Sequence, residues 1–150
     1  MIVSQDTDGL STPYDAGMAW AVKMDKPFFV GQRSLQIVEK QPDRQRLVGF
    51  ALDEGVQNTA LRECHLVIDG GEIAGRVTSV AWSLTVQRTI GLAFVHPTLT
   101  EPGTRITFRV SDGSTVPATV VPTPFYDPGN LRQKDATPSS KMAAPKKEPA

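Results

Sequence analysis

The chain has 150 residues, and its 16 Lys and Arg residues balance 16 Asp and Glu residues, so the formal net charge is zero. This balance offers no basic surface for nucleic acid or for an acidic membrane, and the single cysteine excludes an internal disulfide framework. Because the first residues lack a signal-peptide pattern and no run of about 18 apolar residues occurs, we expect a soluble, cytoplasmic protein with no membrane or nucleic-acid partner.

The first 45 residues carry short, mixed signals. Residues 11–13 (STP) are typical of a helix start, and apolar alternation over residues 18–22 predicts a brief strand. Residues 31–40 have apolar side chains at helical spacing and predict a second helix. The polar, Pro-containing residues 41–45 favour a domain boundary.

From residue 46 onward the pattern indicates β-structure throughout. Apolar runs bounded by turn residues predict six strands, at residues 47–52, 65–68, 74–80, 89–95, 106–110 and 116–121. Such spacing is typical of a small antiparallel barrel or sandwich, with the apolar run 89–95 as a central strand. Asp112 and Gly113 predict a hairpin between the last two strands. Pro117 lacks an N–H, so one strand of this hairpin is expected at a sheet edge.

The last 16 residues, 135–150, contain three prolines and no aromatic residue. They offer little apolar surface to offset the entropy of ordering, so we expect a disordered tail. Their scattered lysines are too few to predict a nucleic-acid-binding arm.

The residues do not form a self-contained catalytic constellation. Cys64 and His65 are neighbours in a predicted strand, where successive side chains point to opposite faces, and His96 is the only other histidine, so a zinc site lacks ligands. Asp6 and Asp8 begin like a calcium loop, but the later Glu is missing, which favours a turn rich in Asp.

Two tryptophans, Trp20 and Trp82, could stack on a flat ligand. Packing in a core or between domains is favoured for each of them. Arg88, between two predicted strands, could bind a carboxylate or remain a surface charge. These residues alone leave the function open.

A resemblance to a known family is carried by several segments in a fixed order. They are residues 5–9 (QDTDG), 12–13 (TP), 16–22 (AGMAWAV), 26–35 (KPFFVGQRSL), 46–50 (RLVGF), 75–79 (GRVTS), 88–93 (RTIGLA) and 124–128 (PFYDP). With them the chain resembles the glycine-cleavage T-protein (aminomethyltransferase) family. Within that family it is most similar to the C-terminal part of sarcosine oxidase alpha subunits and dimethylglycine-oxidising relatives.

The resemblance implies a domain organisation. Residues 1–40 would be the truncated C-terminal end of a folate-binding domain, residues 45–134 the family's C-terminal barrel, and residues 135–150 the tail. The expected fold is therefore mainly β, a small six-stranded antiparallel Greek-key barrel preceded by a short α/β remnant. The family's catalytic aspartate and its pterin-binding glutamate precede residue 5, so no catalytic residue is assigned in this chain.

The resemblance also implies a cofactor and a site. It places Trp20, Lys23 and Lys26 where the folate domain meets the barrel, so that the lysines could meet the glutamate tail of tetrahydrofolate, and it places Tyr126 on the barrel side. Tetrahydrofolate binding is expected to be weak or absent in this chain alone. The expected partners are an upstream folate-binding domain or other oxidase subunits, together with self-association through exposed apolar residues.

Two functions from different classes follow. In the first, the chain is the C-terminal portion of a folate-dependent aminomethyltransferase or of a sarcosine or dimethylglycine oxidase subunit. Such an enzyme transfers a one-carbon unit from an aminomethyl or N-methyl group to tetrahydrofolate, and this portion is expected to be inactive alone. In the alternative, it is a non-catalytic interaction domain that kept only the barrel. The substrate amine, the oligomeric state and the choice between a truncated and a split protein stay open.

Overall fold

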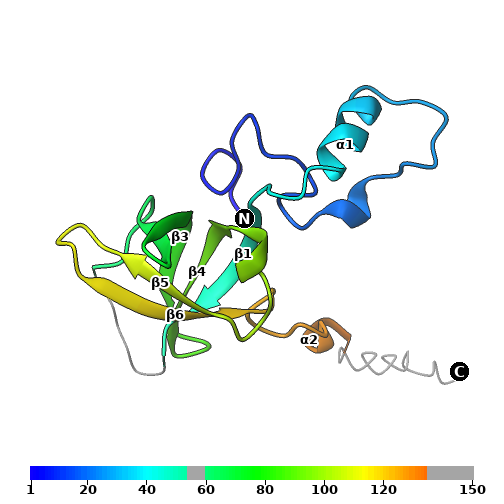
Figure 1. The fold of residues 1–150 in the computed structure, drawn as a ribbon. Coiled ribbons are helices and arrows are strands. Elements are labelled where there is room, and N and C mark those ends of the chain that lie inside the picture. The colour runs from blue at the N-terminus through cyan, green and yellow to red at the C-terminus, as the bar shows by residue number, and fades with distance from the viewer. Residues whose placement is uncertain (54–59, 135–150) are drawn as a thin grey trace, which may run out of the picture.

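A computed structural model of the chain describes residues 1–53 and 60–134 and shows a β-barrel with an N-terminal arm that stands away from it (Figure 1). The elements are η1 (Ala19–Ala21), α1 (Gln32–Glu39), β1 (Arg46–Ala51), β2 (Leu66–Asp69), β3 (Glu72–Ser83), β4 (Arg88–Val95), η2 (Pro97–Leu99), β5 (Arg105–Arg109), β6 (Thr115–Val121) and α2 (Leu131–Lys134). Each of the six predicted strands is confirmed. The predicted disordered tail lies outside the described residues.

The six strands form a closed antiparallel barrel in the order β1-β4-β3-β2-β5-β6. Strand β4 pairs with both β1 and β3, which confirms its predicted central place. The predicted hairpin is the β5–β6 pair, in which Phe108 lies opposite Val116. The barrel formed by the described strands is closed and has no edge strand, so the prediction that one strand of this hairpin lies at a sheet edge is wrong. The missing N–H of Pro117 breaks no hydrogen bond to β1, because β6 pairs with β1 only from Thr119 onward.

The core fills the barrel interior with the inward-facing residues of all six strands. Phe50 and Phe108 are fully buried, and their ring centroids lie 4.6 Å apart at an interplanar angle of 55°. Gly91 faces Phe50 across the β1–β4 pair, and a Cβ atom there would lie 2.5 Å from the Phe50 ring. The small residue on β4 is therefore what makes room for the large ring on β1.

Residues 1–45 differ from their sequence-based interpretation in two places. Residues 13–17 form turns rather than a helix, and residues 19–21 form the short 3₁₀ helix η1 rather than a strand. A strand needs a neighbour to satisfy its backbone groups, whereas here Ala21 N–H donates to Met18 O and Val22 N–H to Ala19 O, both at 3.0 Å. The second predicted helix is confirmed as α1, preceded by Gly31 at φ 91°.

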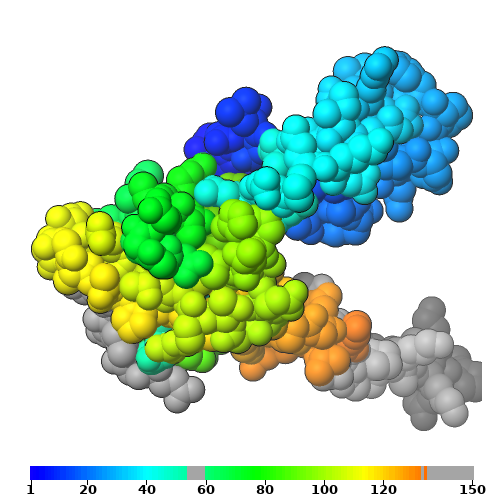
Figure 2. Space-filling model, in the orientation of Figure 1, coloured from blue at the N-terminus to red at the C-terminus, as the bar shows by residue number. Residues whose placement is uncertain are grey.

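We define residues 16–43 as the arm. No residue of the arm is buried, and Figure 2 shows it projecting beside the barrel. Its large side chains Trp20, Phe28 and Val30 are 75%, 78% and 92% exposed. The apolar residues of the arm thus lack the cover that the barrel gives its own. Within the described ranges, none of the helices is long and apolar enough to cross a membrane.

Candidate functional site

The outer surface of β1 and β4 is apolar where a solvent-facing sheet would be polar. In the β1–β4 register, Leu47 lies opposite Phe94, Gly49 opposite Leu92, and Ala51 opposite Ile90. Phe94 is only 4% exposed, although it does not belong to the core cluster inside the barrel. Side chains alternate between the two faces of a strand, so this row points outward and is covered by other parts of the chain.

The segment after β6 covers part of this outer surface. A Cβ atom on Gly49 would lie 2.6 Å from Thr123 Cγ2 and 2.9 Å from Phe125 Cε1. The absence of a side chain at Gly49 therefore lets residues 123–125 pack directly on β1. This contact fixes the Phe125 ring beside the outer face of the barrel.

Between this segment, the arm and the barrel lies an open cavity of about 520 Å³, which we call the apolar hollow. Its lining consists of Met1, Ala16, Gly17, Met18, Trp20, Leu47, Val48, Gly49, Leu92, Thr123, Pro124 and Phe125. None of these described residues carries a charged side chain. The hollow presents two aromatic residues, Trp20 and Phe125, which suit contact with a flat apolar surface.

A second cavity of about 340 Å³ adjoins the apolar hollow and shares Met1, Leu92 and Phe125 with it. Asp6 lies at its border and is 1% exposed. The Asp6 carboxylate accepts hydrogen bonds at 2.6 Å from both Thr78 Oγ1 and Ile2 N–H.

Burial alone would raise the pKa of the Asp6 carboxyl, but the hydrogen bonds from Thr78, Ile2 and Ser79 outweigh it and hold the pKa below its ordinary value. Asp6 is therefore a charged anchor between the N-terminal segment and β3. Its contacts are those of a structural group, because its oxygens are already occupied by donors of this chain.

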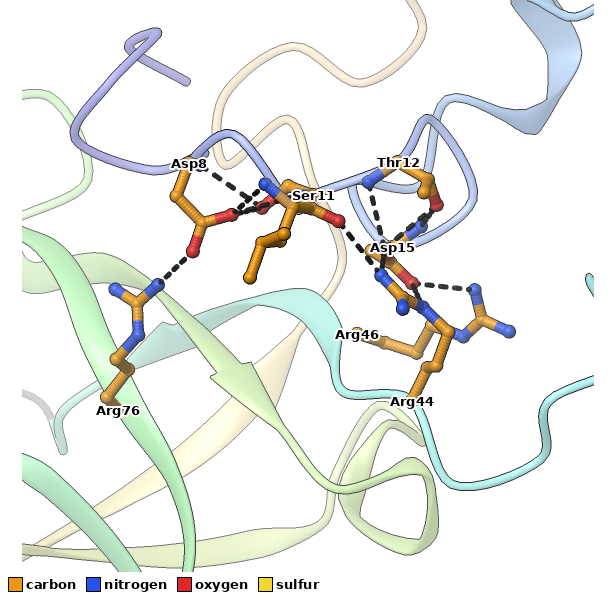
Figure 3. A network of polar contacts seen from close by, with 8 residues as sticks. Asp8, Ser11, Thr12, Asp15, Arg44, Arg46 and Arg76 are labelled. Carbon is orange, nitrogen blue, oxygen red and sulfur yellow. Dashed lines mark hydrogen bonds and ion pairs between the residues drawn. The ribbon is translucent and has the colours of Figure 1, made fainter. Parts of the chain in front are cut away.

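Figure 3 shows a polar network where the arm joins the barrel. Asp15, whose side chain is 3% exposed, accepts hydrogen bonds from Arg44 Nε at 2.9 Å and from Arg44 Nη2. Thr12 N–H and Thr12 Oγ1 donate to the same carboxylate at 2.9 and 2.8 Å. Burial would raise the pKa of Asp15, but the donors from Arg44 and Thr12 lower it below its ordinary value.

Asp8 forms the other side of this network. Its carboxylate accepts the N–H groups of Leu10 and Ser11 at 2.9 and 2.8 Å, which confirms the predicted Asp-rich turn. Arg76 Nη2 lies 3.5 Å from Asp8 Oδ2. The Arg76 guanidinium lies 5.5 Å from the centre of the Phe94 ring. Among the described residues, no group of three or more His, Cys, Asp and Glu side chains could hold a metal ion.

The residues predicted for the cofactor site lie in three places. Trp20 lines the apolar hollow, whereas Lys23 and Lys26 line a separate cavity of about 320 Å³ between the arm and Pro13. Tyr126 lies beside Arg132, whose guanidinium is 5.3 Å from the centre of its ring. Phe125, the neighbour of Tyr126, was not selected from the sequence, but it is the aromatic residue that lines the hollow from the barrel side. The predicted roles of these four residues stay predictions.

The Cys64 and His65 pair has the geometry of a structural feature. His65 Nδ1 accepts the N–H of Arg62 at 3.1 Å, and its Nε2 lies 2.9 Å from Ser111 Oγ. Because Nδ1 is an acceptor, the neutral ring carries its proton on Nε2 and cannot take one from the serine. Cys64 is exposed.

These features define a class of protein, a closed six-stranded barrel whose apolar outer face combines with an N-terminal arm. A model of the family described as "Glycine cleavage T-protein C-terminal barrel domain" matches residues 45–127. The chain belongs to this family, as the sequence resemblance predicted. The narrower relation to sarcosine oxidases stays a prediction.

Known proteins similar to the chain include two enzymes named aminomethyltransferase. The one from Synechococcus sp. (strain CC9311) is 37% identical over 126 residues, which are 83% of this chain and 33% of that protein. The one from Rubrobacter xylanophilus is 42% identical over 127 residues, which are 83% of this chain and 32% of that protein. The chain thus spans about a third of the length of these relatives.

A solved structure has the same fold. The crystal structure of glycine cleavage system aminomethyltransferase T from Bartonella henselae superposes with a TM-score of 0.68 at 24% identity, covering 81% of this chain and 34% of that one. At this level of identity, the superposition establishes the fold.

Proposed function

We propose that this chain supplies the barrel side of a folate-dependent one-carbon transfer site in the cytoplasm. Together with a folate-binding domain, it would support transfer of a one-carbon unit from an aminomethyl or N-methyl group to tetrahydrofolate. The observation that carries the proposal is the apolar hollow between arm and barrel in a member of this family. Its described lining, which has two aromatic residues and no charged side chain, suits one face of a flat ring.

The lining fits only part of the cofactor. Trp20 and Phe125 offer apolar faces, and Met18 and Leu92 would exclude water from that side. Tetrahydrofolate, when bound, supplies the ring nitrogen that accepts the one-carbon unit. Its pterin edge is polar, however, and no carboxylate lines the hollow among the described residues. A partner domain is therefore needed to hydrogen-bond that edge.

The binding free energies that these contacts can supply also show that a partner domain is needed. An aromatic contact contributes about 0.5–1.5 kcal/mol beyond burial. An exposed ion pair of Lys23 or Lys26 with the glutamate tail adds at most about 1 kcal/mol. Micromolar affinity needs about 8 kcal/mol, so these contacts cannot reach it. The chain alone should bind tetrahydrofolate no more tightly than about millimolar.

The exposed residues of the arm provide the surface for the partner. Phe28 and Val30 are among the most exposed large apolar side chains, and cover from a folate-binding domain would remove them from water. Self-association of two copies would bury the same side chains. An oxidase subunit of the sarcosine type is a further partner that the sequence resemblance favours.

Titration calorimetry with tetrahydrofolate tests the proposal. The chain is titrated alone and mixed with a separately produced folate-binding domain of the Synechococcus aminomethyltransferase. We expect weak or no binding to the chain, and binding to the mixture tighter than to the folate domain alone. Trp20→Ala should weaken binding to the mixture by about five- to tenfold, since it removes one aromatic contact.

The matched control is Ile73→Ala, which truncates an exposed apolar residue of β3 that does not line the hollow. It should leave the affinity unchanged. Micromolar binding by the chain alone would contradict the division of the site between two domains. A mixture that binds no better than the folate domain alone would favour the non-catalytic interaction domain.

A further inference from the structure

The two ends of the arm meet at one buried carboxylate. Asp15 lies directly before the arm and Arg44 directly after it, and the two side chains form a double hydrogen bond. Arg44 Nη2 also donates to Leu10 O at 3.1 Å (Figure 3). An ion pair between residues 29 positions apart thus closes the base of the arm. We call these contacts the neck.

The neck is joined directly to the barrel. Leu47 N–H, in strand β1, donates to Asp15 O at 2.7 Å. Arg46 Nη1, in the same strand, lies 3.7 Å from Asp15 Oδ1. Thr12 completes the set with its two donors. One carboxylate therefore connects the segment that enters the arm, the segment that leaves it and the first strand of the barrel.

Beyond the neck, the arm is organised by its own contacts. Gln32 Nε2 donates to Met24 O at 3.3 Å and to Lys26 O at 3.1 Å. Phe29 and Leu35 line the cavity of about 320 Å³, with Pro13 as its one described lining residue outside the arm. Helix α1 lies away from the barrel in Figure 1, and none of its residues is buried. The shape of the arm and its direction thus depend on different contacts.

We propose that Asp15 is a positioning residue, which with Arg44 fixes the direction in which the arm leaves the barrel. The bidentate geometry matters, because two parallel hydrogen bonds fix an orientation that a single ion contact leaves free. The direction decides where Trp20 and the exposed Phe28 are presented. This inference goes beyond the proposed function, since it rests on contacts within this chain and holds whatever the partner is.

Distances between spin labels test the proposal on the full chain. In a Cys64→Ser background, which removes the exposed native thiol, one label is placed on α1 by Gln36→Cys and one on β3 by Glu72→Cys. We expect a narrow distance distribution in this background. Asp15→Ala should broaden it about twofold or more, because the arm then samples several directions.

Two comparisons separate direction from general folding. Arg44→Lys keeps the charge but loses the double hydrogen bond, and it should broaden the distribution less than Asp15→Ala does. Arg105→Gln removes an exposed ion pair with Asp53 in the barrel, which takes no part in the neck, and should leave the distribution narrow.

A second label pair within the barrel, Glu72→Cys with Thr115→Cys, should stay narrow in every variant. The proposal fails if the distribution of distances between the labels on α1 and β3 is already broad before Asp15 is changed. It also fails if Asp15→Ala and Arg44→Lys leave that distribution narrow, or if the barrel pair broadens with it.

Discussion

Replacing Thr78 by valine tests whether the buried Asp6 anchors the N-terminal segment to the barrel. Thr78 is 2% exposed, and its hydroxyl donates to Asp6 Oδ1 at 2.6 Å across 72 positions of the sequence. Valine has a similar volume but no donor. The Asp6 carboxylate would stay buried with the donors of Ile2 and Ser79 and without the Thr78 hydroxyl.

The expected loss follows from the strength of a hydrogen bond to a charged group, about 1.5–3 kcal/mol. For a barrel of this size, a loss of 1 kcal/mol lowers the melting temperature by about 4–8 °C, so Thr78→Val should lower it by about 6–24 °C. Thermal unfolding followed by circular dichroism at pH 7 measures this shift. Thr115→Val, at an exposed position of β6, is the matched control and should change the melting temperature little.

The same variant has a signature in pH dependence. The pKa of Asp6 is lowered in the folded state, so the folded protein binds fewer protons than the unfolded one in the acid range. The stabilisation from this group is complete above the unfolded pKa of about 3.9 and is lost as the pH falls through the folded pKa.

Without the Thr78 donor, the pKa of Asp6 rises towards its unfolded value, so the stability lost on acidification should be smaller and the loss should be complete at a higher pH. A decrease in stability smaller than about 0.5 kcal/mol at pH 7, or an unchanged acid profile, would refute the reasoning.

Four further substitutions test the barrel. Gly91→Ala would place a Cβ atom 2.5 Å from the Phe50 ring, and overpacking of this kind costs about 1–3 kcal/mol, measurable as a lower midpoint in urea. Ala93→Asp puts a charge at a fully buried position of β4 and should abolish folding, as judged by circular dichroism, whereas Leu92→Asp on the outer face should still fold. Arg105→Gln removes an exposed ion pair and should leave the urea midpoint unchanged, and a clear shift would contradict that interpretation.

The strands were predictable because their signals are local. Alternation with period two and turn residues determine where a strand begins and ends, and the Asp112-Gly113 turn predicted the hairpin that β5 and β6 form. Closure of the barrel depends instead on β1 and β6, which are far apart in the sequence. A local pattern cannot show that pairing, so Pro117 was assigned to an edge that the barrel does not have.

The roles of the Asp6 and Asp15 carboxylates were not predictable either, because their partners lie far away in the sequence. Asp6 was interpreted as a turn residue, and its burial depends on Thr78 in a distant strand. Asp15 fits the first turn of a predicted helix, yet its partner Arg44 lies in the polar segment that was interpreted as a boundary. A buried Asp is improbable from composition alone, and only the pairing of distant segments reveals its donors.

The candidate site was predictable in part. An exposed tryptophan in the arm, Trp20, was selected and lines the apolar hollow. Phe125 was missed, although Gly49 in strand β1 carries the signal. A glycine within a strand marks a close approach of another segment, and here that segment is residues 123–125. The glycine in the sequence could indicate that another segment packs closely on β1, but it could not identify Phe125 as the residue of that segment.

The stability of this molecule resides in the barrel, whereas the arm contributes exposed side chains to the candidate site, which affects how variants should be interpreted. The fully buried side chains belong to the barrel and to Asp6, whereas no residue of the arm is buried. Truncating an exposed side chain such as Phe28 removes little buried area, so its cost in folding free energy should be small. A loss of partner or cofactor binding in an arm variant can therefore be assigned to the surface itself, provided that the Asp15 neck is intact.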